Sequence, residues 1–321
     1  MHGRELPGKK GGVRPAPRKV YLREKRMVWP RVGLLIEAVL ALGAAFLPKA
    51  AWAGGPPAET AAEQFQALRM EYERAAAAGP LTDAERLAFV GRVYKQRTAV
   101  AQKLLELAEA HPADPIALDA LTLAVWQVNT VPWPVDLVGE DPVRGRAFEL
   151  IVRDHLRSER LAPLCIRVGY GFCKEYESFL RAVLEKNPHP KVRAAACVAL
   201  GHFLFHRQQR MELCRGQPEL AAQFEALYGA DYVAGLMQAN PEAAIKESEA
   251  LFEVAAEQYS GIQLPDGETV GERARAELFE IRHLRVGVVA PEIEGEDQHG
   301  QTFRLSEYRG KVVLLDFWSH V

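Results

Sequence analysis

The sequence predicts a mainly α-helical protein, either a helical bundle or an array of helix pairs, followed by a short segment of α/β character. Helix N-cap signals and prolines recur from Ala58 to about Leu284, and the pattern changes after Leu284. Apolar residues make up 48% of the 321 residues, which is enough for a large core. We expect three parts: residues 1–53, 54–285 and 286–321.

The first part, residues 1–53, has the layout of a secretory signal peptide. Ten Lys or Arg residues precede an apolar run from Val32 to Leu47, and Ala51-Trp52-Ala53 offers an Ala-x-Ala cleavage site. The alternative is an uncleaved anchor, in which Val32–Leu47 is the membrane contact. The true start is open between Met1 and Met27. We therefore expect an exported protein, periplasmic or extracytoplasmic, or one anchored in the membrane by this run.

The rest of the chain is acidic. From Gly54 onward there are 29 basic and 39 acidic residues, a net charge of −10. Nucleic-acid binding relies on a basic surface that neutralises phosphates. The charge therefore argues against nucleic acid as a partner.

The second part, residues 54–285, carries repeated helix-start signals. Three Thr-x-x-Glu sequences fit a capping box, and three Asp-Pro or Asn-Pro pairs put an N-cap before a proline in the first turn. The capping boxes are Thr60/Glu63, Thr82/Glu85 and Thr269/Glu272, and the proline pairs are Asp114-Pro115, Asp141-Pro142 and Asn240-Pro241. Residues 130–142 read as a non-helical interruption, and residues 264–269 read as a polar turn.

Two stretches of this part resemble each other. Residues 107–126 and 183–204 each end one helix, turn through prolines and start an Ala/Leu/Val-rich helix, and residues 152–171 look like a degraded third copy. Such spacing suits TPR- or HEAT-like helix pairs. Because the periods are uneven, a non-repetitive bundle is the alternative. Either architecture predicts a scaffold or docking surface for a protein partner that the sequence does not identify.

Two histidines in this part have a spacing that metal-binding helices use. His202 and His206 are four residues apart, but Phe203 stands where the His-Glu-x-x-His motif has its glutamate. We interpret the two as a hydrogen-bonded pair at the edge of the core, with metal binding as the alternative. Arg282, His283 and Arg285 read as a solvated helix end. We assign no catalytic, cofactor-binding or metal-binding residue and no cofactor.

The four cysteines Cys165, Cys173, Cys197 and Cys214 form no Cys-x-x-Cys pair and have no zinc-finger spacing. We interpret them as small buried apolar residues. The alternative in an oxidising compartment is two disulfides, for which three connectivities exist. Cys165 and Cys173 flank a plausible turn that could bring them together.

The third part, residues 286–321, contains an acidic stretch, a turn at His299-Gly300, a short alternating strand from Thr302 to Leu305 and an apolar run from Val312 to Leu315. The unbroken apolar run is typical of a strand buried on both faces. The whole segment resembles the opening of a thioredoxin-like domain of the redoxin branch, which comprises TlpA-like thiol–disulfide oxidoreductases and the alkyl hydroperoxide reductase/thiol-specific antioxidant group. The matching positions are Val286-Gly287, Ala290-Pro291, Ile293, Gly300, Phe303, Leu305-Ser306, Tyr308, Gly310-Lys311 and Val313 to Trp318.

The resemblance implies a Cys-x-x-Cys after the Phe-Trp strand, at the start of the next helix. A helix N-terminus stabilises a thiolate, so the first cysteine can attack a disulfide. In this sequence only Ser319, His320 and Val321 follow Trp318. We therefore expect the N-terminal portion of an exported oxidoreductase or redoxin with a truncated thioredoxin-like domain, inactive as given, whose substrate would be a protein dithiol or disulfide, or a peroxide. The alternative is a non-enzymatic helical-repeat interaction scaffold with a vestigial tail.

Overall fold

The computed structural model describes residues 59–76, 83–128, 142–296 and 299–315. The chain divides into two units. The helical unit covers residues 54–288, and the described residues of the other unit, here named the C-terminal segment, are 289–296 and 299–315. Each is described by itself.

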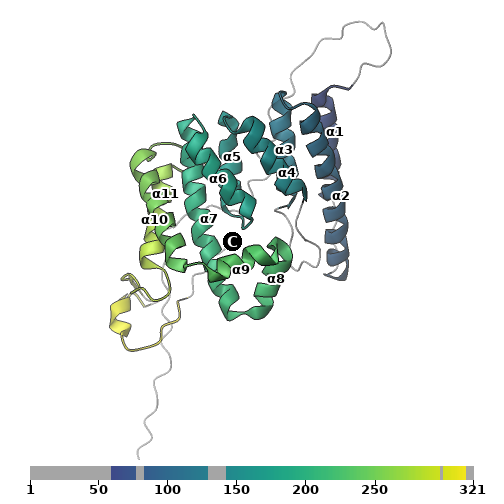
Figure 1. The fold of residues 1–321 in the computed structure, drawn as a ribbon. Helices are drawn as coiled ribbons and strands as arrows, with labels where there is room; N and C mark the ends of the chain where they lie inside the picture. The colour runs from purple at the N-terminus through teal and green to yellow at the C-terminus, as the bar shows by residue number, and fades with distance from the viewer. Residues whose placement is uncertain (1–58, 77–82, 129–141, 297–298, 316–321) are drawn as a thin grey trace, which may run out of the picture. The chain divides into compact units, whose positions relative to one another are not determined.

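The described part of the helical unit holds eleven α-helices, which confirms a mainly α fold. Several consecutive helices pack as pairs, from α1 and α2 on one side to α10 and α11 on the other, and the central α7 also packs against α5 and α10 (Figure 1). The helices are α1 Ala61–Ala76, α2 Asp83–Ala110, α3 Pro115–Val128, α4 Pro142–Leu150, α5 Ala162–Gly169, α6 Lys174–Lys186, α7 Pro190–Gly216, α8 Pro218–Tyr228, α9 Ala230–Gln238, α10 Pro241–Gln258 and α11 Val270–His283.

Two of the expected capping boxes form as predicted. The Thr269 hydroxyl accepts from the backbone N–H of Glu272 at 3.2 Å, and the Glu272 carboxylate accepts from the Thr269 N–H at 3.0 Å. Thr60 and Glu63 make the same reciprocal pair at 3.2 and 2.8 Å. Each box satisfies amides that a helix start leaves without partners. Thr82 lies outside the described residues.

The two Asx-Pro helix starts among the described residues also form side-chain N-caps, as predicted. Asn240 Oδ1 accepts from the backbone N–H of Glu242 at 3.0 Å, and Asp114 Oδ1 accepts from that of Ile116 at 2.9 Å. Pro241 and Pro115 open their helices, where a missing N–H costs nothing. Asp141 and residues 130–141 of the interruption expected at 130–142 lie outside the described residues, and Pro142 is the first residue of α4.

Helix α7 forms the centre of the helical unit. Its buried side chains, such as Val192, Cys197 and Phe203, lie on every side of the helix, as expected for a helix covered all round. Two glycines allow its neighbours to come close. A Cβ on Gly169 of α5 would lie 3.0 Å from the Ala199 carbonyl oxygen, and a Cβ on Gly201 would lie 2.9 Å from the Phe252 ring of α10.

The two similar stretches do form the helix–turn–helix units that the sequence predicts. Helix α2 ends at Ala110 before α3, and α6 ends at Lys186 before α7. The stretch read as a third copy differs, because it contains a π-helical turn, Ile151–His155, and a 3₁₀ turn, Glu159–Leu161, before the short α5. The helix pairs are packed but irregular.

The C-terminal segment holds a two-stranded antiparallel hairpin and a 3₁₀ turn. Strand β1 (Glu294–Glu296) pairs with β2 (Thr302–Arg304), and Gly295 lies opposite Phe303. Gly300 adopts a φ of 74°, a left-handed conformation that favours glycine in a turn. The turn and the strand that the sequence predicts here are confirmed, and the 3₁₀ turn Leu305–Tyr308 follows.

The strand expected at Val312–Leu315 is not formed. These residues lie in no ladder, and Val312 and Leu314 are 103% and 92% exposed. A strand of a parallel sheet needs neighbours on both sides and cover on both faces. Within the described residues β1 and β2 form the only sheet, so this run has no neighbour to pair with.

Candidate functional site

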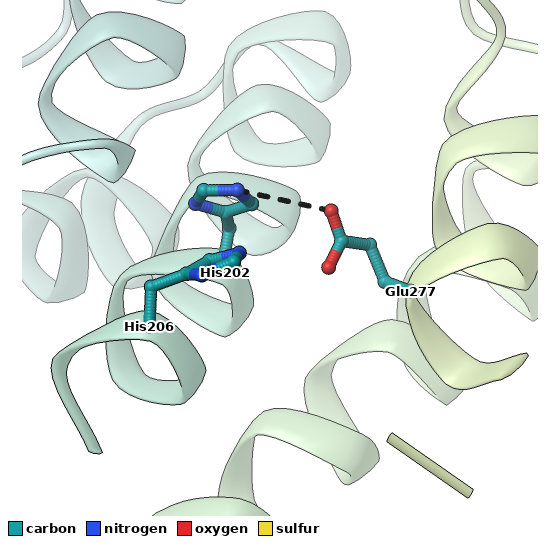
Figure 2. Close-up of side chains that lie close together, drawn as sticks. All are labelled: His202, His206 and Glu277. Atoms are coloured by element: carbon teal, nitrogen blue, oxygen red, sulfur yellow. Dashed lines mark ion pairs between the residues drawn. The ribbon is translucent and has the colours of Figure 1, made fainter. Parts of the chain in front are cut away.

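The best-formed cluster of chemically active side chains lies between α7 and α11. His202 and His206 project from α7, and Glu277 projects toward them from α11 (Figure 2). His202 Nε2 lies 3.9 Å from Glu277 Oε1, and the two imidazole ring centroids are 3.9 Å apart. One ligand atom from each of the three residues lies within 4.8 Å of the others. Within the described residues no other group of three or more His, Cys, Asp or Glu meets that geometry.

Helix geometry explains why these residues meet. Residues four apart share a helix face, so His202 and His206 stack along α7. The buried residues Val270, Ala274, Leu278 and Ile281 form the apolar stripe of α11. Glu277, next to Leu278, lies at the border of that stripe, where α11 packs on α7 and α10.

A backbone carbonyl sets the orientation of the His202 ring. His202 Nδ1 lies 3.1 Å from the Gly169 carbonyl oxygen. Because a carbonyl only accepts, Nδ1 carries the proton and donates it, which leaves the Nε2 lone pair directed toward Glu277. The Tyr170 ring also packs against the His202 ring, with the two centroids 4.3 Å apart.

Burial controls the ionisation of all three groups. Only 12% of the His202 side chain and 13% of the Glu277 side chain are exposed. Burial, reinforced by the neighbouring His206, lowers the pKa of His202 to about 3, and burial also lowers the pKa of His206. Burial together with the Glu280 carboxylate raises the pKa of Glu277 to about 7. Both imidazoles are therefore neutral near pH 7.

The nearby cations are engaged elsewhere. Arg273 forms ion pairs with Asp266 and Glu268 at 2.7 and 2.6 Å. Arg210 donates to the Gly171 carbonyl oxygen at 2.7 Å. The field of Arg273 at the cluster is therefore offset by two carboxylates.

His202 and His206 are both partly buried, as the core-edge interpretation predicted, and the His202 ring is hydrogen-bonded to a backbone carbonyl. Sequence reasoning missed Glu277, because it lies on another helix far along the chain. The sequence gives only an indirect indication of Glu277. The apolar pattern of α11 places this glutamate directly before Leu278, at the edge of the buried face of the helix.

The four cysteines are buried and free, as the simpler interpretation predicted. Burial raises the pKa of Cys173 to about 11 and that of Cys197 to about 12, and it raises the pKa of Cys165 and Cys214 as well. A thiol must ionise to attack a disulfide. These cysteines are therefore poor nucleophiles, and none of the three possible disulfide connectivities is present.

Arg282 and His283 at the end of α11 are exposed, as predicted, whereas Arg285 is half-buried and donates to the Ile281 carbonyl oxygen at 2.8 Å. The exposed end is also paired with α10. Arg282 contacts Glu249 at 2.5 Å and also pairs with Glu253, while His283 is exposed. Exposed ion pairs of this kind contribute little to stability.

Comparison of the chain with family models, with curated proteins and with solved structures found no match. None of the helices in the described residues has the length and apolar character required to span a bilayer. The chemistry of the cluster therefore has to be argued from its own atoms. Two neutral imidazoles and a carboxylate can hold a divalent metal ion, and they can also exchange a proton.

Proposed function

We propose that the C-terminal segment begins a redoxin-type, thioredoxin-like domain carried behind a helical docking unit. In this proposal the protein is exported and takes part in dithiol–disulfide exchange or peroxide reduction. Its catalytic Cys-x-x-Cys would follow Trp318 beyond the sequence printed here, since the residues up to Val321 include no cysteine after Cys214.

The hairpin carries this proposal. The ordered matches to the redoxin pattern predict a turn at Gly300 and a strand from Thr302, and both are present with β1 paired to β2. The stretch from Leu305 to Tyr308, which matches the Leu-Ser-x-Tyr of the pattern, forms a 3₁₀ turn. The strand that the pattern predicts at Val312–Leu315 is not formed, so this run does not support the proposal.

The cysteines of the helical unit do not supply this chemistry. All four are buried with raised pKa values, and none lies at the start of a helix after a strand. Reduction of insulin by the 321-residue chain should therefore stay at background. Turnover above background would place the redox centre on the helical unit and refute this assignment.

The coding sequence after the Val321 codon is the most direct test. A continuation that encodes Trp-Cys-x-x-Cys, in frame or after a one-base shift, supports the oxidoreductase. Its absence refutes it and leaves the second candidate, a non-enzymatic interaction scaffold of TPR- or HEAT-like helix pairs. The pairs that consecutive helices form, α2 with α3, α6 with α7 and α10 with α11, favour that second candidate.

Export has a separate test, because residues 1–58 lie outside the described residues. N-terminal sequencing of the mature protein should find a start near Gly54. A mature protein that retains Val32–Leu47 would instead indicate the membrane anchor.

A further inference from the structure

We propose that His202, His206 and Glu277 bind a divalent transition-metal ion of the zinc type between α7 and α11. This site goes beyond the redox role and does not depend on it. It uses side chains of the helical unit alone.

The set of donor atoms fits such an ion. Two imidazole nitrogens and one carboxylate oxygen are the three protein ligands of many zinc sites, and related sets hold other first-row metals. Hard cations such as Mg²⁺ or Ca²⁺ prefer oxygen ligands only. The two nitrogen donors therefore select a transition metal.

The distances allow binding with small movements. Ligand atoms about 2.05 Å from a tetrahedral zinc ion lie about 3.3 Å apart. His202 Nε2 and Glu277 Oε1 are 3.9 Å apart, and the three donor atoms lie within 4.8 Å of one another. Closing the cluster by up to about 1.5 Å, from 4.8 Å to about 3.3 Å, lies within the reach of side-chain torsions, above all in Glu277.

The surroundings of the cluster match those of a metal site. Metal-binding histidines almost always donate their second ring N–H to a carbonyl or carboxylate, and His202 Nδ1 does so to the Gly169 carbonyl at 3.1 Å. Glu277 Oε2 is buried and has no hydrogen-bond partner within the described residues. A buried carboxylate oxygen without a partner is costly, and a bound cation would satisfy it.

Binding would join two helices that are distant in sequence. His202 and His206 belong to the central α7, whereas Glu277 belongs to α11, the last helix of the unit. Three protein ligands leave a fourth position for water or another small ligand. The ion would therefore hold α11 on α7 and stabilise the folded unit by mass action.

The test is titration of the chelator-treated 321-residue chain with Zn²⁺ by calorimetry and with Co²⁺ by visible absorption. We expect one equivalent per chain, d–d bands of a low-coordinate Co²⁺ site, and a rise in Tm of about 5 °C at a Zn²⁺ concentration 100-fold above Kd. His206→Gln and Glu277→Gln should each weaken metal binding by at least about tenfold. Loss of a residue that only hydrogen-bonds a metal ligand already lowers affinity by about 10- to 100-fold, and these two changes remove a ligand itself.

The matched controls are His283→Gln, an exposed histidine on α11, and Glu257→Gln, an exposed carboxylate on α10. Both should bind as the unchanged chain does. Far-UV circular dichroism of each metal-free variant checks that it is folded. If one ligand variant fails to fold, the other decides.

Three results would overturn the proposal. The first is an absence of stoichiometric binding, and the second is equal binding by folded His206→Gln or Glu277→Gln. The third is a sulfur-to-cobalt charge-transfer band, which would show that the cysteines bind the metal instead.

Discussion

Apolar side chains are buried in the helical unit but exposed in the C-terminal segment. In the helical unit Phe252 is 0% exposed, and side chains from four or more helices cover one another around α7. In the C-terminal segment Leu314 is 92% exposed, and none of its described residues is buried. An apolar run therefore becomes part of a core only where neighbouring elements are present to cover it.

The same contrast applies to carboxylates. Burial raises the pKa of Glu277 to about 7. Glu292 of the C-terminal segment is exposed, and its pKa is lowered because it accepts hydrogen bonds from Ser306 and from the Ile293 N–H. A carboxylate is thus perturbed by dehydration in one region and by local hydrogen bonds in the other.

The largest expected effect comes from the core of the helical unit. Phe252→Ala should lower the free energy of unfolding by about 3–5 kcal/mol, because it leaves a cavity beside α7. The matched change Leu314→Ala should alter it by less than about 0.5 kcal/mol, because Leu314 is already in water. Urea denaturation measures both. Equal losses in the two variants would show that the C-terminal segment contributes to the core.

Glu277 should make the stability of the helical unit depend on pH. Because its pKa is raised from 4.5 to about 7 in the folded state, the folded state holds the proton more tightly than the unfolded state. Stability contributed by the protonated form is present below pH 4.5 and is lost as the pH rises to about 7. Glu277→Gln should therefore stabilise the unit at pH 8, by about 3 kcal/mol at most, and change little at pH 4.

Chelator must be present in this experiment so that no metal contributes. His202 and His206 also lower stability below their ordinary pKa values, so the comparison at pH 8, where both imidazoles are neutral in either protein, is the decisive one. Glu292→Gln is the exposed control and should produce no rise in stability at pH 8. A Glu277→Gln difference that does not vary with pH would show that this carboxyl group has the same pKa in the folded and unfolded states.

Sequence patterns predicted the parts of this molecule that depend on neighbouring residues. The capping boxes at Thr60 and Thr269 and the turn at Gly300 each use interactions within a few residues, and all are present. The pairing of Glu277 with His202 could not be predicted, because it depends on how α11 packs on α7. Val312–Leu315 shows the converse, since its apolar pattern predicts a strand but pairing partners decide whether one forms.

Close helix packing gives the next prediction. Gly201→Val should lower the free energy of unfolding by about 1–3 kcal/mol, because a Cβ there would lie 2.9 Å from the buried Phe252 ring. In contrast, a Cβ added at Gly235 on α9 would have no atom within 4 Å. Gly235→Ala should therefore raise the free energy of unfolding by about 0.5–1 kcal/mol, because alanine has the higher helix propensity. Thermal unfolding followed by circular dichroism distinguishes the two. A neutral Gly201→Val would mean that α10 can move away from α7 without loss.

The smallest effect tests whether local structure contributes to stability only when it is attached to a core. Thr269→Ala removes the hydroxyl that caps the Glu272 N–H at the start of α11, which packs into the helical unit, and should lower the free energy of unfolding by about 1 kcal/mol. Thr302→Ala removes an exposed side chain from β2 of the hairpin and should change the free energy of global unfolding by less than about 0.5 kcal/mol.

Hydrogen exchange provides the sharper measurement of this contrast. The amides of α11 should exchange through global unfolding, whereas those of β1 and β2 should exchange through local opening and become protected only if a partner strand is supplied. Strong protection of the hairpin in the 321-residue chain would contradict the contrast between the two regions.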